Sequence, residues 1–510
     1  MAEAGVRCGP VERSYPVVRE RAARLASAMA ELGVQPGDRV ALVLRNDVTF
    51  VEATIAAGLL GVVPVPVNWH WKGAELRHLL TDSAATLVLA HSHLLSVVED
   101  ALAGPDVAPS VPVIEVAVPD GLVAGYGLSG PVALSGRHPD LERLVGEHPP
   151  WEGDPAARPA AMIYTSGTTG TPKGVERELS TPEQTAAGGR GLFQIFGIEA
   201  DHRVLLPAPL YHTAPNTHSA VAAAAGLDLT IMARFDPEEF LRLVEEQRIN
   251  STQMVPTMFV RLLRLPPEVR GRYDLSSLRA IVHAAAPCPV DVKHAIIDWF
   301  GPIVREYYGG TESGAVVACD AQQWLDHPGT VGTAVADAEI RIYDDDGAVL
   351  PAGTTGHVYA RPPSFWPNFT YRGDPAKRAA VERAGGFITV GDVGHLDADG
   401  YLYLSDRASD MVISGGVNIY PAEIEACLLS LPGVRDAAVF GIPDAEFGES
   451  LAAHVDVDPA AGLTPDDVRT HIRENLASYK VPRIVEFDAN LPREDSGKLF
   501  KRKLKERYAR

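Results

Sequence analysis

Residues Tyr164–Gly174 read YTSGTTGTPKG, a stretch dominated by glycine, serine and threonine that contains a single lysine. The apolar run AAMIY (160–164) before it predicts a buried strand that opens into a loop of hydroxyl and backbone N–H donors. Such a loop is typical of a phosphate cradle, although Gly/Ser/Thr clusters also occur in ordinary surface loops. The loop is not a Walker A motif, because Gly174 follows Lys173, and a P-loop NTPase is therefore disfavoured.

The composition is that of a large globular chain. Its 510 residues, 46% of them hydrophobic, predict more than one domain with a sizeable core. The net charge of −20 argues against nucleic acid or an anionic membrane as the main partner. The four cysteines are not in CxxC spacing, so neither a zinc site nor a disulfide framework is expected. Without an apolar secretory segment or a run of about 20 apolar residues, the expected location is the cytoplasm, with no membrane span.

Short apolar strands alternate with amphipathic helices along most of the chain. A helix is predicted over Ser14–Gly33, with strands at Arg39–Asn46 and Val62–Asn68. This alternation predicts βαβ units and parallel sheets, an α/β fold. Residues 104–159, which are rich in Pro, Gly and Ala, are expected to form a surface connection with an irregular strand.

The pattern changes twice in the second half of the chain. Residues 332–360 alternate apolar and polar positions around DDDGAVLPAG, which predicts a hairpin in a small antiparallel, barrel-like subdomain. After 404–411 the chain restarts as an α+β module of roughly one hundred residues, in which Thr464 is the expected N-cap of a helix. We therefore expect an N-terminal domain of residues 1–406 and a small, mobile C-terminal domain of residues 407–510.

The loop sequence at 164–174 resembles the phosphate-binding signature of the adenylate-forming superfamily, which includes acyl-CoA synthetases, amino-acid adenylation domains and luciferases. Four further stretches match that family's motifs in the same order along nearly the whole chain. They are LYHTAP (210–215), REYYGGTES (305–313), GFITVGDVGHLDADGYLYLSDRASDMVISGGVNIYPAEIE (386–425) and LPREDSGKLFKRKL (491–504).

The resemblance implies an ATP site. In it Tyr308 packs against adenine, Thr311 contacts the α-phosphate and Glu312 binds Mg²⁺. A metal is physically sensible here, because ATP carries about four negative charges that oppose attack by a carboxylate. The implied ATP- and AMP-binding residues are Thr165, Ser166, Gly167, Thr168, Thr169, Gly170, Lys173, Ala285, Ala286, Pro287, Tyr308, Gly309, Thr311, Asp392 and Arg407.

The resemblance also implies an acyl pocket and a thiol entrance. Small wall residues favour an apolar and bulky acid, although they also suit close backbone packing. The stretches expected to form the pocket wall are YHTAPN (211–216), MVPTMF (254–259), HAAAPC (283–288) and YYGGTES (307–313). They contain no Arg or Lys, which disfavours a second carboxylate on the substrate. The implied acyl-pocket residues are Tyr211, His212, Met254, His283, Ala284, Gly309 and Gly310; Gly415 and Gly416 would admit the thiol; Ser409 is at the hinge position; and Lys498, Thr311, Glu312 and His212 form the catalytic set.

The chain departs from the family pattern at four positions. Val390 replaces the usual Thr, and Ser409 stands where Asp or Lys is more usual. The pair Glu176–Arg177 replaces the common continuation of the phosphate loop. There we expect an altered local cap, with ATP binding retained.

The implied reaction has two steps, which use ATP, Mg²⁺ and coenzyme A. A carboxylic acid becomes acyl-AMP, and a thiol then cleaves the mixed anhydride to give acyl-CoA, AMP and pyrophosphate. An amino-acid adenylation domain is disfavoured, because no acidic residue lies between Leu210 and Ala220. Transfer to the phosphopantetheine of an acyl carrier protein remains an alternative, as does a catalytically idle nucleotide-binding regulator. A homodimer is a further expectation.

Overall fold

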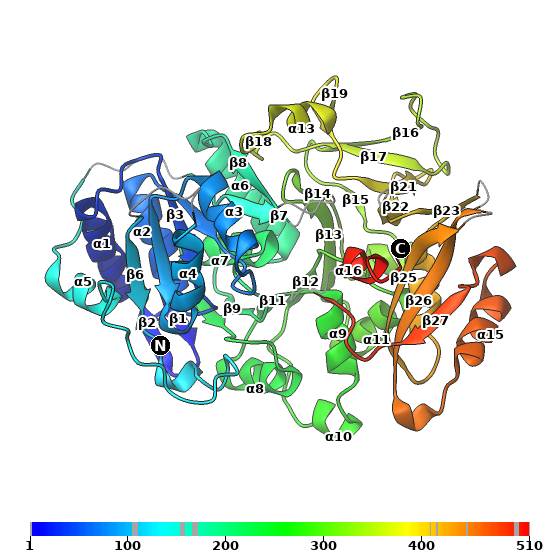
Figure 1. Cartoon of the computed structure of the whole chain (residues 1–510), viewed down its shortest axis with the longest axis horizontal. Helices are drawn as coiled ribbons and strands as arrows, with labels where there is room; N and C mark the ends of the chain where they lie inside the picture. Colours follow the sequence, from blue (N-terminus) through cyan, green and yellow to red (C-terminus); the bar gives the residue numbers. More distant parts are fainter. Residues whose placement is uncertain are drawn as a thin grey trace.

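The computed structural model describes residues 3–104, 111–153, 159–165, 172–407, 410–414, 417–444, 447–493 and 499–508. Figure 1 shows a large N-terminal part, and at its right the C-terminal strands beside helices α9 (Pro256–Leu263) and α11 (Val290–Phe300). The two parts touch, since the guanidinium of Arg264 donates to the main-chain carbonyl of Arg435. The expected α/β architecture, with a large domain and a smaller C-terminal one, is confirmed.

A nine-stranded sheet forms the centre of the N-terminal part. Its six inner strands run parallel, and antiparallel strands close both ends. In sheet order the strands are β15 (Thr333–Ala334), β14 (Gly314–Cys319), β13 (Val304–Gly310), β12 (Ala280–His283), β11 (Ser251–Met254), β9 (Arg203–Leu206), β10 (Asp228–Ile231), β1 (Gly5–Cys8) and β2 (Val11–Ser14).

A second, four-stranded parallel sheet comes from the first quarter of the chain. Apolar β-branched and Leu residues make its inner strands nearly continuous hydrophobic runs, as sheets covered on both faces require. In sheet order the strands are β4 (Val63–Pro66), β3 (Arg39–Val43), β5 (Leu87–His91) and β6 (Val113–Val116).

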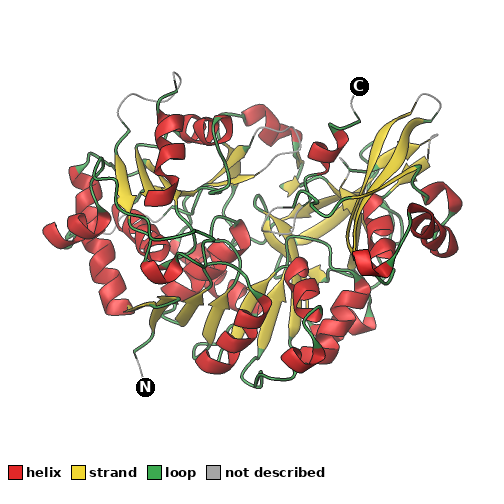
Figure 2. Ribbon diagram, turned by 60° about the horizontal axis from the view of Figure 1, so that its bottom comes forward, coloured by secondary structure: helices red, strands yellow, loops and turns green. Residues whose placement is uncertain are grey.

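Helices fill three layers around the two parallel sheets (Figure 2). One buried cluster joins the facing sides of both sheets through α1 (Tyr15–Glu31), α2 (Val48–Leu60), α6 (Pro182–Phe196) and α7 (Thr213–Ala224). The far face of the nine-stranded sheet is covered by α8 (Pro237–Gln247), α9, α11 and α12 (Ala321–Asp326). The far face of the four-stranded sheet packs against α3 (Ala74–Ser83) and α4 (Leu95–Leu102).

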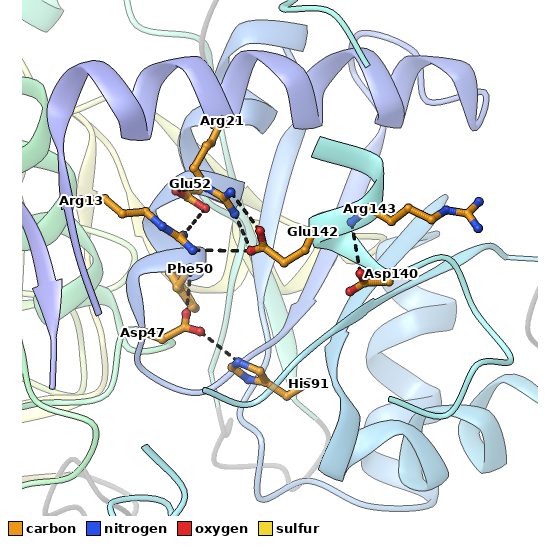
Figure 3. A network of polar contacts seen from close by, with 9 residues as sticks. All are labelled: Arg13, Arg21, Asp47, Phe50, Glu52, His91, Asp140, Glu142 and Arg143. Carbon is orange, nitrogen blue, oxygen red and sulfur yellow. Dashed lines mark hydrogen bonds and ion pairs between the residues drawn. The ribbon is translucent and has the colours of Figure 1, made fainter. Parts of the chain in front are cut away.

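A buried carboxylate ties the N-terminal helices together (Figure 3). Glu52 on α2 is 1% exposed and accepts from Arg13 at 2.8 Å and from Arg21 at 2.9 Å. Arg21 also donates to Glu142 on α5 (Leu141–Glu147) at 2.6 Å. Burial raises the pKa of Glu52 while the two arginines oppose that rise, so the ion pairs keep an otherwise costly carboxylate in the core.

Two smaller sheets complete the N-terminal part. The first has three strands, β18 (Phe369–Tyr371), β8 (Lys173–Arg177) and β7 (Ile163–Thr165). The second has six antiparallel strands and contains the expected hairpin, formed by β16 and β17. Its members are β16 (Glu339–Tyr343), β17 (Gly356–Arg361), β19 (Glu382–Arg383), β20 (Phe387–Ile388), β21 (Asp392–Leu396) and β22 (Leu402–Arg407); two short helices, α10 (Pro267–Arg270) and α13 (Pro375–Ala380), lie outside the sheets.

The C-terminal α+β module is confirmed. Thr464 caps α15 in a capping box with Asp467, as the sequence predicts. Its helices are α14 (Pro421–Leu429), α15 (Pro465–Asn475) and α16 (Lys501–Lys505), and its strands are β23 (Val412–Ser414), β24 (Val417–Ile419), β25 (Val434–Asp444), β26 (Gly448–Val457) and β27 (Ile484–Phe487).

Some local predictions need correction. The helix predicted over Ser14–Gly33 begins at Tyr15, and Ser14 occupies its N-cap position without a capping hydrogen bond from the side chain. The stretch 104–159 contains the regular helix α5 in addition to β6. Within the described residues, no helix combines the length and apolar character needed to cross a membrane.

Candidate active site

The expected phosphate loop joins the antiparallel strands β7 and β8, where Thr165 lies opposite Lys173. The ammonium of Lys173 is 3.3 Å from the carboxylate of Asp374, the N-cap residue of α13. Lys173 is thus held at the mouth of the hairpin by a surface carboxylate that a phosphate could replace. The middle of the loop lies outside the described residues; it contains Ser166, Gly167, Thr168, Thr169 and Gly170.

The turn between β13 and β14 requires glycine. A Cβ atom on Gly309 would lie 1.7 Å from the carbonyl oxygen of Gly314, so no other residue fits this close approach. A Cβ atom on Gly310 would meet Val390 at 2.7 Å. Val390, one of the departures from the family pattern, therefore packs directly against the turn that carries the site.

The side chains of Thr311 and Glu312 are held from two directions. The Thr311 hydroxyl is 2.6 Å from that of Thr213, at the start of α7. The Tyr371 hydroxyl on β18 donates to Glu312 Oε1 at 2.8 Å. Burial and the neighbouring carboxylate raise the pKa of Tyr371, which keeps the phenol protonated as a donor. The Glu312 carboxylate is consequently oriented while it retains further acceptor capacity.

A third group of predicted residues meets beside this turn. The hydroxyl of Tyr308 donates to Asp392 Oδ2 at 2.7 Å, and Asp392 is 8% exposed. Asp392 and Arg407 are direct partners across β21 and β22. The Arg407 side chain is not among those described. The fold thus brings three positions predicted for adenine and ribose to one place.

The loop after β12 contains a strained residue. Ala285 has a φ of 75°, which is uncommon for a residue with a Cβ and costs about 1–3 kcal/mol. Ala284 is buried, Ala286 is half-buried, and Ala285 and Pro287 are exposed. Strain at the carboxyl end of a parallel strand is typical of a loop shaped for a ligand.

The predicted acyl-pocket residues lie on or next to elements that pack against different faces of the nine-stranded sheet. Met254 and His283 end β11 and β12, and both pack in the layer of α9 and α11. His283 lies 5.1 Å from the Phe259 ring and 3.7 Å from Glu306. Tyr211 and His212 instead precede α7, on the opposite face. That all four line one pocket stays a prediction.

Comparison with known proteins identifies the family. The model described as AMP-binding enzyme matches residues 4–367, and that described as AMP-binding enzyme C-terminal domain matches residues 423–498. The chain belongs to the AMP-binding enzyme family. The sequence-based assignment to adenylate-forming ligases is confirmed.

Relatives of this AMP-binding enzyme resemble it over their whole length. Feruloyl-CoA synthase of Amycolatopsis sp is 33% identical over 99% of this chain and 95% of its own. Fatty acid–[acyl-carrier-protein] ligase ScoC of Streptomyces coeruleorubidus is 30% identical over 99% and 93%. The crystal structure of ATP-bound MatB from Rhodopseudomonas palustris superposes with a TM-score of 0.82 at 29% identity and covers 99% and 96% of the two chains.

The remaining predicted site residues lie in the last hundred or so positions of the chain, and Lys498 is the last residue matched by the family's C-terminal-domain model. Strands β23 and β24 pair and bracket Gly415 and Gly416, while Arg493 pairs with Leu499 on either side of the segment with Lys498. The predicted residues Ser409, Gly415, Gly416 and Lys498 lie outside the described residues, so their roles stay predictions.

Sequence reasoning missed contacts that the AMP-binding enzyme makes around Glu312. Tyr371 carried no signal, and Thr213 lies in the LYHTAP stretch without a predicted role, because the contacts of both residues depend on tertiary neighbours. Arg177 did carry one, as a departure from the family pattern. Its guanidinium donates to the carbonyl oxygens of Thr311 and Glu312, a contact with the site that extends beyond the altered local cap we expected.

Proposed function

We propose that this AMP-binding enzyme joins a carboxylic acid to coenzyme A through an acyl-adenylate, with release of AMP and pyrophosphate. The observation that carries the proposal is the assembly of Glu312, Thr311 and the Tyr308–Asp392 pair beside the β7–β8 hairpin. Tyr308, Thr311 and Glu312 belong to one short stretch, and their hydrogen-bond partners Asp392, Thr213 and Tyr371 come from distant parts of the chain. A merely structural turn would not need them together.

The nucleoside end of ATP fits the Tyr308–Asp392 pair. The Asp392 carboxylate accepts a hydrogen bond from Tyr308 and is proposed to accept from the ribose hydroxyls when ATP is bound. Arg407, the strand partner of Asp392, is proposed to assist. The Tyr308 ring would then lie against the adenine.

The residues present also fit a magnesium ion. Glu312 offers carboxylate oxygen beside the expected phosphates, and Mg²⁺ prefers one or two carboxylates together with phosphate oxygens. Bound there, the metal would neutralise phosphate charge. The Thr311 hydroxyl, fixed by Thr213, is proposed to contact the α-phosphate, and Lys173 with the loop to hold the β- and γ-phosphates.

In the first step a carboxylate oxygen of the acid attacks the α-phosphorus, and the bond to pyrophosphate breaks. Lys498 would stabilise the negative charge that develops on the transferring group. In the second step the thiol sulfur attacks the acyl carbon, and AMP leaves with the bonding electrons. We propose that the C-terminal domain turns about Ser409 between the steps, so that Gly415 and Gly416 admit the thiol arm.

The acid is proposed to be apolar and bulky, in keeping with the small residues around the predicted pocket. The similarity to ScoC supports one alternative acceptor, the phosphopantetheine of an acyl carrier protein. A cytoplasmic location and a homodimer complete the proposal.

A product assay by mass spectrometry tests the function. The protein is incubated with MgATP and aliphatic, aryl and polycyclic acids, with and without coenzyme A, alongside Lys498→Ala and Glu312→Gln. Acyl-CoA from one acid class, with acyl-AMP formation reduced at least about 100-fold in both variants, is the expected result. Acyl-AMP without thioester would point to the carrier protein. If no acid yields AMP or pyrophosphate, the ligase proposal is wrong and a regulator is favoured.

A further inference from the structure

Arg177 is the last residue of β8, the strand that leaves the phosphate loop. One of its guanidinium nitrogens donates to the carbonyl oxygen of Thr311, and the other lies 3.4 Å from that of Glu312. One planar guanidinium thus donates to two consecutive main-chain carbonyls, an arrangement that the single ammonium of a lysine could not reproduce. The contact crosses 134 positions of sequence, so only the tertiary fold creates it.

The guanidinium is itself held in place by an aromatic ring. Its central carbon lies 4.5 Å from the centroid of the Trp366 ring. The same ring lies against Gly314, where an added Cβ would come within 2.3 Å of it. Trp366 therefore packs on both the arginine and the turn that the arginine grips. Burial lowers the pKa of Arg177 to about 10, so it remains a cation at neutral pH.

The neighbouring strand reaches the same glutamate from the other side. Strands β8 and β18 pair with Phe369 opposite Arg177 and Tyr371 opposite Val175. Tyr371 bonds the Glu312 carboxylate, while Arg177 bonds the main chain of the same residue. One small sheet, which also carries the phosphate loop, thereby fixes both the backbone and the side chain of Glu312.

The other departure at this place points elsewhere. The Glu176 carboxylate instead lies 3.6 Å from the guanidinium of Arg372. The alternation of side chains along β8 explains the difference, because adjacent residues face opposite sides of a sheet. Of the pair, only Arg177 reaches the turn.

We propose that Arg177 is a positioning residue that couples the phosphate-loop hairpin to the metal-binding carboxylate Glu312. This inference rests on the proposed function, since it takes Glu312 as the magnesium ligand. Arg177 fixes the turn relative to β8, so that the Glu312 carboxylate would hold Mg²⁺ beside the hairpin that bears the phosphate loop. Losing such a supporting contact to a metal ligand typically weakens metal affinity or activity by about 10–100-fold.

The test measures ATP binding by isothermal titration calorimetry over a range of Mg²⁺ concentrations, and separately the kcat and KM of adenylation. We expect Arg177→Leu to raise the Mg²⁺ concentration for half-maximal ATP binding about tenfold or more, with a fall in kcat. Arg177→Lys restores the charge without the fork, so it should not rescue binding. Tyr371→Phe should give a smaller shift in the same direction.

Arg372→Leu is the matched control, because Arg372 lies next to β18 and donates to Asp82 instead of the turn. It should leave the Mg²⁺ dependence unchanged. If Arg177→Leu alters only the thermal midpoint, or if Arg177→Lys restores binding fully, the positioning role is overturned. Wild-type ATP binding that does not depend on Mg²⁺ would overturn the metal role of Glu312 as well, which separates the two failures.

Discussion

The two parallel sheets end their strands differently. At the ends of β3 and β5 in the four-stranded sheet, polar groups bond one another. The His91 ring is 3.0 Å from the Asp47 carboxylate (Figure 3). It also accepts a hydrogen bond from the Arg45 amide at 3.0 Å. At the end of β12 in the nine-stranded sheet, both ring nitrogens of His283 are without a hydrogen bond to any described residue.

Asn46, which follows β3, connects this edge of the four-stranded sheet to the nine-stranded sheet. Its amide donates to the carbonyls of Ala208 and Met232, and its oxygen accepts from the Leu210 amide. These partners follow β9 and β10, so Asn46 fastens the four-stranded sheet to the nine-stranded one. Ligands of open α/β sheets bind beyond the carboxyl ends of strands. Here one such edge is used for assembly, and the other, with Gly309 and Ala285, carries the candidate site.

The largest effect on the free energy of unfolding is expected at the buried ion pair between α11 and β13. Lys293 on α11 is 1% exposed and pairs with Glu306 on β13. Lys293→Met leaves a buried carboxylate without its cation, which should lower the free energy of unfolding by about 3–5 kcal/mol at pH 7.

Denaturant titration of Lys293→Met checks this, with Glu306→Gln added to recover most of the loss. Burial raises the pKa of Glu306, so the loss in the single variant should shrink as the pH falls and the carboxyl becomes neutral. Lys480→Met, which removes a partly exposed pair with Glu423, is the control and should cost less than about 1 kcal/mol. Equal losses in both variants would contradict the prediction.

A matched pair of substitutions tests the two edges directly. His91→Phe removes an acceptor and leaves Asp47 without its imidazole, so we expect a loss of about 2–4 kcal/mol in unfolding free energy. His283→Phe breaks no hydrogen bond to a described residue and should change stability by less than about 1 kcal/mol. Urea unfolding of both variants measures the difference; similar losses would mean that the edges are equivalent.

The smallest effect concerns His218 on α7, between the sheets. Complete burial lowers its pKa from 6.5 to about 3, and its ring stacks on Phe196 at 4.6 Å. The unfolded chain binds a proton below about pH 6.5 while the folded state does not, so stability should fall as the pH drops from 6.5 towards 3. His218→Phe should reduce the loss between pH 7 and pH 5 by about 2 kcal/mol. An unchanged pH dependence of unfolding would contradict the assignment.

Individual helices and strands were predictable where the spacing of apolar residues and the capping or turn residues point to the same element. The helix predicted over Ser14–Gly33 is observed as Tyr15–Glu31, and the Thr464 capping box and the β16–β17 hairpin are as expected. The partners of strands were not predictable. Strand β1 lies beside β10, more than two hundred positions later, because its apolar pattern specifies a strand but no neighbour.

The sequence by itself determined the reaction family, since a phosphate loop and four ordered motifs are local patterns that survive without coordinates. It also marked Arg177 as unusual without saying why. Only the tertiary structure decided what Arg177 contacts, which edge of which sheet stays open, and that Tyr371 orients Glu312. The physical reason is that hydrogen bonds and burial are set by neighbours in space, and the pairing of β8 with β18 brings together residues nearly two hundred positions apart.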